Sequence, residues 1–577
     1  MLKPVSKRQL QRIRERLGRL YGEDEAELLA ERLWSMVGRY GVGLDPKSPE
    51  QLWDETDAVL ITYGDSLLEE ERAPLSTLRD FSRTHFKGAL STIHILPFYP
   101  WSSDDGFSVI DYRKVDPAVG TWDDVEALGD GFKLMFDLVL NHCSSKSPWF
   151  KDFEQGIDPA RRYFITENPD TDLSAVVRPR TSPLLTKTKT RDGVRHVWTT
   201  FSADQVDLNW ANPDVLFEFL DILFYYIAKG AQSIRLDAVA FLWKKVGTDC
   251  IHLPETHEMV RLLRDTVELV APHVVLITET NVPQPENLSY FGDGDEAHMV
   301  YNFSLPPLLL HALLTNDATF LHKWASELPD PGSGRTYFNF TASHDGVGVR
   351  PLTGLLPDGT LEWVVERVKE RGGRVSYRTQ SDGSQTPYEL NITYVDALRD
   401  LDQPERSVPR FLLSQTIAMS LRGMPALYIH SLLGTENYQQ GVEESGHNRS
   451  INRRKWEIGA LNEQLRDPES RQSTIFNALL KLLRRRRNHP AFHPDGAMEV
   501  HDFGKPLFGF TRTAPDGSQK ILCLFNMTGD KQPIPKLPGV DRGASSLREL
   551  ITGRSLNPQR NGGKTLDAYQ ALWLEIG

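Results

Sequence analysis

Ser233-Ile-Arg-Leu-Asp-Ala-Val-Ala240 is the stretch of sequence on which the architecture depends. Its short apolar run is typical of a buried β-strand rather than of a helix. Arg235 and Asp237 stand two positions apart, so their side chains share one face of the strand. A buried carboxylate is costly unless a cation keeps it ionised, and an ionised carboxylate is what a nucleophile needs. A purely structural ion pair is the alternative, and residues elsewhere in the chain decide between the two.

Seven further apolar runs resemble this one, with helical sequence between them. A strand followed by a helix, repeated eight times, predicts a parallel (β/α)8 barrel, an α/β fold. The predicted strands are residues 59–63, 92–97, 134–140, 233–240, 274–278, 299–303, 337–342 and 425–429.

Polar residues follow several of these strands at the point where each one ends. In a parallel barrel these positions line the face that carries the active site. Their agreement with the strand ends therefore predicts a site there. The residues are Asp104-Asp105, Asn141-His142, Asp237, Glu279 and His344-Asp345.

Two connections are too long for simple loops and predict inserted lids over the barrel mouth. Alternating apolar residues near the end of the chain predict a small β-sandwich. The expected division is an N-terminal helical extension at 1–56, barrel parts at 57–142, 208–346 and 401–487, an inserted B domain at 143–207, a second lid at 347–400 and a C-terminal β domain at 488–577.

The N-terminal extension predicts two helices, the second running from residue 24 to about 40. Its arginines form a basic face that suggests RNA or membrane contact. We expect it instead to be the solvated side of an amphipathic helix packed on the core. The apolar positions are Leu10, Ile13, Leu17 and Leu20, and the arginines are Arg12, Arg14, Arg16 and Arg19.

Composition narrows the class of protein. The 577 residues carry a net charge of −12, which argues against nucleic acid as a partner. No apolar run is long enough to cross a bilayer and no hydrophobic signal core opens the chain, so we expect a cytoplasmic protein without a membrane partner. The three cysteines lack metal-ligand spacing, which fits reduced thiols; a zinc site at Cys250, His252 and His257 is the weaker alternative.

Four short motifs in register with the barrel resemble the α-amylase superfamily: Asp137-Leu-Val-Leu-Asn-His142, Ser233-Ile-Arg-Leu-Asp-Ala238, Ile277-Thr-Glu-Thr280 and Phe340-Thr-Ala-Ser-His-Asp345. The resemblance covers residues 57–577 and is closest to the sucrose phosphorylase group. Further marks of that group are Leu60-Ile-Thr-Tyr63, His94-Ile-Leu-Pro-Phe98, Arg178-Pro-Arg180, His344-Asp-Gly-Val-Gly348 and Ile451-Asn-Arg453.

Within the group, the N-terminal extension and Pro100-Trp-Ser-Ser-Asp-Asp-Gly-Phe107 resemble the glucosylglycerate phosphorylases. Sucrose phosphorylases carry Tyr-Gln in the second lid where this chain has Tyr388-Glu389. That departure lies where the acceptor binds, with Tyr388 among the expected binding residues, and it weighs against sucrose as the substrate.

The resemblance implies phosphorolysis of an α-glucoside with retention of configuration. Asp237 is the expected nucleophile, Glu279 the acid and base, and Asp345 the carboxylate that steadies the oxocarbenium-like charge. The acid needs a raised pKa, which we expect the neighbouring Asp237 to provide. Retaining geometry places the two reacting carboxyl groups about 5–5.5 Å apart.

The same resemblance implies the binding residues. His142 and His344 are expected to donate to glucose hydroxyls, although a buried histidine is often only part of the core. Arg180, with a cation from residues 367–378, is expected to bind phosphate. The remaining expectations are Asp104 paired with Arg453 around the far end of glucose, Phe107 and Phe241 on the sugar face, and Arg235 beside the nucleophile.

The expected function is therefore a phosphorylase that converts 2-O-α-D-glucosyl-D-glycerate and inorganic phosphate to α-D-glucose 1-phosphate and D-glycerate. The alternatives are a sucrose or sucrose 6′-phosphate phosphorylase, an α-glucosidase or transglucosidase of the same fold, and a catalytically inactive binding scaffold. A scaffold is expected to have lost Asp237, Glu279 or Asp345, and all three are present. No cofactor and no metal is implied, and an oligomer is compatible with the sequence but not indicated by it.

Overall fold

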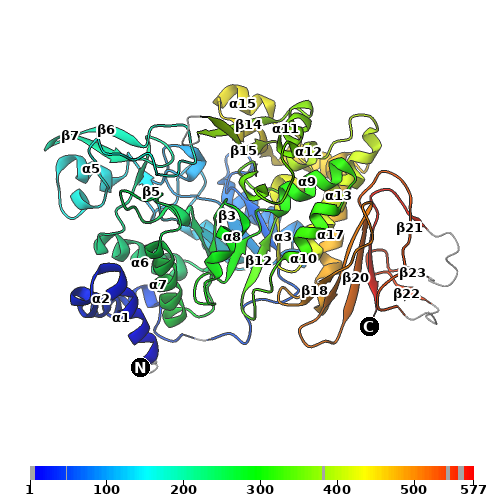
Figure 1. Ribbon diagram of the computed structural model, residues 1–577, viewed down its shortest axis with the longest axis horizontal. Helices are drawn as coiled ribbons and strands as arrows, with labels where there is room; N and C mark the ends of the chain where they lie inside the picture. The colour runs from blue at the N-terminus through cyan, green and yellow to red at the C-terminus, as the bar shows by residue number, and fades with distance from the viewer. Residues whose placement is uncertain (1–6, 47, 380–383, 541–545, 557–564, 577) are drawn as a thin grey trace.

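The structure, a computed structural model, describes residues 7–46, 48–379, 384–540, 546–556 and 565–576. At its centre eight parallel strands close into a barrel (Figure 1), in the order β1, β3, β4, β9, β10, β11, β12 and β16. The predicted (β/α)8 fold is confirmed. The strands are β1 Val59–Thr62, β3 Thr92–Ile95, β4 Lys133–Val139, β9 Ala231–Asp237, β10 Val275–Thr278, β11 Met299–Tyr301, β12 Thr336–Asn339 and β16 Met424–Tyr428.

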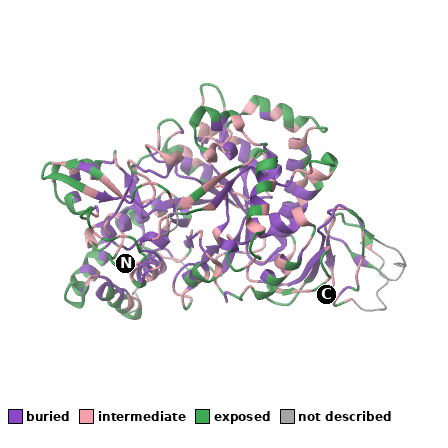
Figure 2. Cartoon of the chain, turned by 45° about the horizontal axis from the view of Figure 1, so that its top comes forward, coloured by how far each residue is buried: buried purple, intermediate pink, exposed green. Residues whose placement is uncertain are grey.

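The strands at the centre are buried, whereas the outer faces of the surrounding elements are exposed (Figure 2). Parallel strands covered on both faces are apolar almost throughout, as expected for this class of sheet. The register of β4 and β9 sets Asp137 beside Arg235. The register of β9 and β10 sets Leu236 beside Thr278, so that Glu279 follows immediately. Strand pairing thus brings the charged residues of three strands to one end of the barrel.

Helices connect the strands and cover the barrel. No helix within the described ranges combines the length and the apolarity that crossing a bilayer requires. Their bounds are α3 Pro74–His85, α4 Trp122–Gly129, α6 Pro213–Ala228, α7 Pro254–Val270, α8 Gln284–Leu288, α9 Leu305–Thr315, α10 Thr319–Glu327, α13 Ser407–Ser420, α14 Ile429–Leu432, α15 Gln439–Ser445, α16 Ile458–Arg466 and α17 Arg471–Arg486. A short parallel pair joins β2 Leu67–Leu68 to β17 Trp456–Glu457.

Both long connections form small subdomains at the same end of the barrel, the top of the view in Figure 1. Residues 380–383 of the predicted second lid lie outside the described residues. The first connection contains β5 His142–Ser144, α5 Pro148–Gln155, β6 Leu185–Thr190, β7 Gly193–Trp198 and β8 Gln205–Asp207. The second contains β13 Val347–Gly348, α11 Thr360–Glu370, β14 Arg374–Thr379, β15 Gln385–Asn391 and α12 Tyr394–Ala397.

The N-terminal extension forms a hairpin of α1 Lys7–Tyr21 and α2 Glu23–Met36, and α1 packs against α7 (Figure 1). The second helix ends at Met36 rather than near residue 40, because Val37 is extended and Gly38 has a positive φ of 91°.

Helix α1 packs on the core as expected, but the expectation that its arginines lie on a solvated face is wrong for Arg16. Arg16 is buried and forms ion pairs with Glu258, Asp265 and Asp295. Arg12 and Arg19 also contact acidic residues of α7. The arginines were assigned to the outer face because helical spacing cannot show that the partner helix is acidic.

The C-terminal region contains a four-stranded antiparallel sheet, in the order β18, β19, β20 and β25, and two two-stranded sheets. One face of the large sheet packs on the barrel, where the Trp573 indole donates to the Ser420 hydroxyl at 2.8 Å. Leucines on the other face, including Leu522 and Leu574, pack in a separate cluster. The strands are β18 Ala497–Val500, β19 Leu507–Thr513, β20 Lys520–Asn526, β21 Gln532–Pro533, β22 Leu547–Arg548, β23 Ser555–Leu556, β24 Thr565–Leu566 and β25 Ala571–Glu575.

Candidate active site

A cavity of about 670 Å³, partly open to solvent, lies where the predicted site residues meet. Ten of the twelve residues expected from the sequence line it, which agrees with their expected clustering at the strand ends. They are Asp104, Phe107, His142, Arg180, Asp237, Phe241, Glu279, His344, Asp345 and Tyr388. Arg235 and Arg453 do not line this cavity.

Arg235 lies beside the cavity and connects three carboxylates. Its Nη1 donates to Asp237 Oδ1 at 2.6 Å and also contacts Asp137, while its Nη2 lies 3.8 Å from Glu279 Oε2. On the far side of Asp137, the His94 Nε2 lies 2.6 Å from Oδ2. The expected side-by-side arrangement of Arg235 and Asp237 is therefore present, and the guanidinium serves a larger network than the sequence suggested.

Burial has the largest effect on the pKa of Asp237. It raises the pKa of the Asp237 carboxyl well above its ordinary value, the Arg235 guanidinium opposes the rise, and the Glu279 charge adds to it. Arg235 favours the ionised form of Asp237, as expected, but the cost of removing the charge from water is the larger effect. Asp237 and Glu279 together hold a proton more readily than two separate carboxylates do.

Glu279 is fixed by the backbone that follows Asp237. Ala238 has a positive φ of 50°, and its N–H donates to Glu279 Oε2 at 3.0 Å. Burial raises the pKa of Glu279, Arg235 opposes the rise, and the Asp345 carboxylate adds to it. The expected raised pKa is present, but burial rather than the charge of Asp237 is its main cause.

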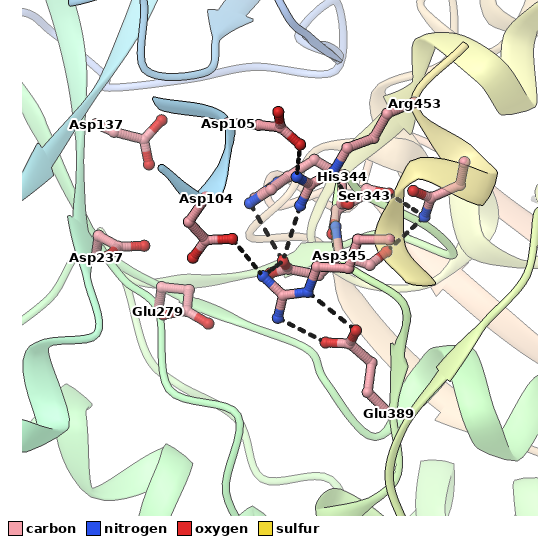
Figure 3. Close-up of polar contacts among 12 residues, drawn as sticks. Asp104, Asp105, Asp137, Asp237, Glu279, Ser343, His344, Asp345, Glu389 and Arg453 are labelled. Atoms are coloured by element: carbon pink, nitrogen blue, oxygen red, sulfur yellow. Dashed lines mark hydrogen bonds and ion pairs between the residues drawn. The ribbon is translucent and has the colours of Figure 1, made fainter. Parts of the chain in front are cut away.

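Asp345 lies on the opposite wall with Asp104 and Glu389, all turned toward one guanidinium (Figure 3). Arg449 Nη1 lies 2.6 Å from Asp345 Oδ1 and 3.6 Å from Asp104 Oδ1. Its Nη2 lies 2.8 Å from Glu389 Oε2. Burial acts to raise the pKa of Asp345, but the combined charges of the surrounding arginines, of which Arg449 has the largest effect, outweigh it and the pKa lies below its ordinary value. Asp345 is therefore a firmly ionised carboxylate.

The expected pairing of Asp104 with Arg453 is not present. Arg453 Nη1 forms an ion pair with Asp105 instead, and its Nε donates to the backbone oxygen of His344 at 2.8 Å (Figure 3). Asp104 and Asp105 both have positive φ, 53° and 45°. This turn directs the two neighbouring carboxylates to different sides. The sequence therefore could not show which of the two aspartates pairs with Arg453.

The two predicted histidines stand on either side of Phe107. His142 Nε2 lies 3.0 Å from the Phe107 oxygen and 3.1 Å from Gln205 Nε2. The His344 ring stacks on the Phe107 ring, with centroids 4.6 Å apart and planes at 6°. Burial lowers the pKa of both histidines, so both are neutral at neutral pH and able to donate or accept hydrogen bonds.

Arg180 lies over two aromatic rings, with its guanidinium carbon 5.3 Å from the centroid of Tyr388 and 5.9 Å from that of Phe201. The second cation expected from residues 367–378 is not at the cavity. None of residues 367–378 lines it, and Arg367 pairs with Glu370 at 2.6 Å on α11 instead. Arg350 and Arg449 line the cavity in its place.

Sequence reasoning missed several lining residues. Arg449 stands four positions before Arg453 and just before the Ile451-Asn-Arg453 motif. Its closeness to that motif could have identified it as a candidate site residue. Asn281 stands two positions after Glu279 and could have been identified in the same way. Other missed lining residues are Phe201, Gln205 and Arg350, whereas Glu389 lines the cavity beside Tyr388, where the resemblance placed the acceptor.

Comparison with known proteins gives the family. Residues 89–327 match the family model for the α-amylase catalytic domain. A glucosylglycerate phosphorylase of Spirochaeta thermophila is 47% identical over 98% of both chains. A glucosylglycerate phosphorylase of Escherichia coli is 44% identical, over 98% of this chain and 100% of the relative.

The chain belongs to the sucrose phosphorylase group of the α-amylase superfamily. A crystal structure from the same phosphorylase group, the sucrose 6F-phosphate phosphorylase of Thermoanaerobacter thermosaccharolyticum, superposes with a TM-score of 0.71 at 26% identity. The superposition covers 82% of this chain and 94% of that one. The N-terminal extension falls within the near full-length match to the glucosylglycerate phosphorylases, as the resemblance implied.

Proposed function

We propose that the protein is a retaining phosphorylase that cleaves 2-O-α-D-glucosyl-D-glycerate with inorganic phosphate to α-D-glucose 1-phosphate and D-glycerate. The observation that carries this proposal is the near full-length identity of 47% to a phosphorylase of that name. The cavity supports it, because three acidic side chains, Asp237, Glu279 and Asp345, meet there with several arginines. The arginines, Arg180, Arg350 and Arg449, suit two substrates that carry anions.

In the first step the Asp237 carboxylate attacks the anomeric carbon of glucose. Glu279 gives its proton to the glycosidic oxygen as the bond from carbon to oxygen breaks, and D-glycerate leaves. The raised pKa of Glu279 favours the protonated form that this step needs. The product of the step is a β-glucosyl ester on Asp237 and an ionised Glu279.

In the second step an oxygen of phosphate attacks the same carbon from the face that D-glycerate left. Asp237 departs as a carboxylate, and Glu279 takes the proton from the attacking phosphate. Two inversions give retention, and the enzyme returns to its starting protonation state. The reaction as written needs no cofactor.

The remaining lining residues hold the glucosyl group. Asp345, kept ionised by the surrounding arginines, balances the positive charge that develops on the sugar. We assign His142, His344 and Asp104 to glucose hydroxyls and Phe107 and Phe241 to the apolar face of the ring. We assign Arg180, which has aromatic neighbours and no carboxylate partner within the described chain, to phosphate. We expect a cytoplasmic protein, because all three cysteines are buried free thiols.

The test is incubation of the purified protein with phosphate and each of three donors: 2-O-α-D-glucosyl-D-glycerate, sucrose and sucrose 6′-phosphate. The expected result is release of α-D-glucose 1-phosphate from the first donor at the highest kcat/KM. Asp237→Asn is expected to abolish turnover. Preference for either sucrose donor, a β-configured product, or equal turnover without phosphate contradicts the proposal.

A further inference from the structure

Two guanidiniums of the active-site cavity have no ionic partner. Arg180 and Arg350 both line it, and in the described part of the chain neither is in an ion pair or a side-chain hydrogen bond. Arg449, in contrast, contacts Asp104, Asp345 and Glu389. The cavity therefore holds cations that are already neutralised by the protein and cations that are not.

The backbone fixes Arg350 beside Tyr388. Strand β13 pairs with β15, which sets Gly348 opposite Glu389, and the N–H of Val349 donates to the oxygen of Tyr388 at 3.1 Å. Arg350 follows directly at the start of a 3₁₀ turn that contains Pro351. Since the two residues before Arg350 are both paired with β15, its Cα has little freedom to leave the cavity wall.

Arg180 reaches the same tyrosine from the first insertion, with its guanidinium carbon 5.3 Å from the Tyr388 ring centroid. Burial raises the pKa of Tyr388, and both Arg180 and Arg350 act against that rise, which agrees with two cations near the hydroxyl. Two unpaired guanidiniums so placed repel one another, and solvation by water is the ordinary way to reduce that cost. An anion bound between them reduces it further and makes use of bidentate geometry.

The two anions of the proposed reaction have similar shapes around the reacting oxygen. In D-glycerate the carboxylate oxygens are three bonds from the oxygen bound to glucose, and in phosphate the remaining oxygens are two bonds from it. Because one anion leaves before the other enters, a single subsite serves both. Asn281 adds a neutral contact at the same wall, since its Oδ1 is buried without a hydrogen-bond partner in the described chain and can accept from a hydroxyl.

We propose that Arg350, together with Arg180, forms an anion subsite that the carboxylate of the leaving 2-hydroxy acid and the incoming phosphate occupy in turn. This inference rests on the proposed function for the identity of the acid. It makes Arg350 a specificity-determining residue that selects anionic over neutral acceptors.

The test uses α-D-glucosyl fluoride as donor, so that the departure of the leaving group does not depend on the anion subsite. Transfer to D-glycerate, phosphate and glycerol is measured for wild type, Arg350→Ala, Arg350→Lys and Arg378→Ala. Arg378 is the matched control, because it is a neighbouring arginine that does not line the cavity. Thermal unfolding of each variant reports whether it folds.

For Arg350→Ala we expect the KM for D-glycerate and for phosphate to rise at least tenfold and the ratio of glycerate to glycerol transfer to fall at least tenfold. Arg350→Lys is expected to recover part of this ratio, and Arg378→Ala to leave it within twofold. An equal loss of transfer to glycerol and D-glycerate, or an unchanged ratio, overturns the inference.

The two proposals fail in different ways. If the wild-type protein prefers sucrose to glucosylglycerate, the proposed function is wrong, yet the effect of Arg350→Ala on the KM for phosphate still tests the subsite. If the wild-type protein cleaves glucosylglycerate and Arg350→Ala does not discriminate between charged and neutral acceptors, only the subsite is wrong.

Discussion

Arg449 and Glu389 form a two-point ion pair, with Nε 3.1 Å from Oε1 and Nη2 2.8 Å from Oε2. The remaining nitrogen of the same guanidinium, Nη1, lies 2.6 Å from Asp345 Oδ1. Glu389 belongs to the second insertion and Asp345 follows the barrel strand β12, so one side chain ties the lid to the third carboxylate of the site. Glu389, which the resemblance singled out in the second insertion, is therefore a structural anchor as well as part of the cavity.

Glu389→Gln is expected to lower kcat/KM for glucosylglycerate by about 10- to 100-fold, because removing one partner of a buried charged pair leaves the other partly unpaired and free to move. Steady-state kinetics and thermal unfolding measure the effect. Glu366→Gln, an exposed glutamate of α11 on the same insertion, is the matched control and is expected to behave as wild type. Unchanged kinetics in Glu389→Gln would show that Asp345 and Asp104 hold Arg449 without the lid.

Glu279→Gln tests the raised pKa of Glu279 through stability. The folded wild-type protein holds this proton more tightly than the unfolded chain, so its stabilising contribution is present below the ordinary pKa of 4.5 and is lost as the pH rises through the raised value. Glutamine does not titrate and also removes a charge that raises the pKa of Asp237. The difference in Tm, variant minus wild type, is therefore expected to grow with pH above about 4.5.

The control for this measurement is Glu463→Gln on α16, an exposed position whose Tm difference is expected to stay flat with pH. A Glu279→Gln difference that is equally flat would contradict a raised pKa. In kinetics, the same variant is expected to accept α-D-glucosyl fluoride, which leaves without a proton, and to lose most of its activity on glucosylglycerate.

Arg180→Ala is expected to reduce phosphorolysis by at least tenfold while the slow hydrolysis of the same donor changes much less, because water needs no cation to hold it in place. Parallel assays of glucose 1-phosphate and of free glucose measure the two rates. Arg178→Ala is the matched control, since this arginine lies two positions away and contacts the backbone oxygen of Ser182. Equal losses of both rates in Arg180→Ala would assign the residue to the glucosyl group rather than to phosphate.

Arg16→Met is expected to lower the free energy of unfolding by about 3–5 kcal/mol, because it leaves Asp265, which is buried, with one cation fewer. Thermal unfolding measures the loss. Arg14→Ala is the control on the same helix, because the pair of Arg14 with Glu27 is largely exposed and such pairs contribute about 0–1 kcal/mol. Similar unfolding of the two variants would contradict a structural role for the buried network.

Much of the site was predictable because barrel strands position residues by simple rules. The period of two along β9 places Arg235 and Asp237 on one face, and the parallel order of β9 and β10 brings Glu279 to the same end. The contacts of residues on loops were harder to predict from the sequence. Asp104 and Asp105 differ only in how a turn with positive φ directs them, and sequence spacing does not encode that choice.

The amino-acid sequence by itself determined the barrel, its eight strands and the three carboxylates at their ends, because these depend on short-range periodicity and on strand order. Only the tertiary structure decided which charges meet. Arg453 pairs with Asp105, Arg449 with Asp345 and Glu389, and Arg16 with α7, in each case across more than a hundred residues or between separate subdomains. Burial also decided the pKa of Asp237 against its neighbouring cation. The energy of a charge depends on everything packed around it, and the order of residues along the chain does not list those neighbours.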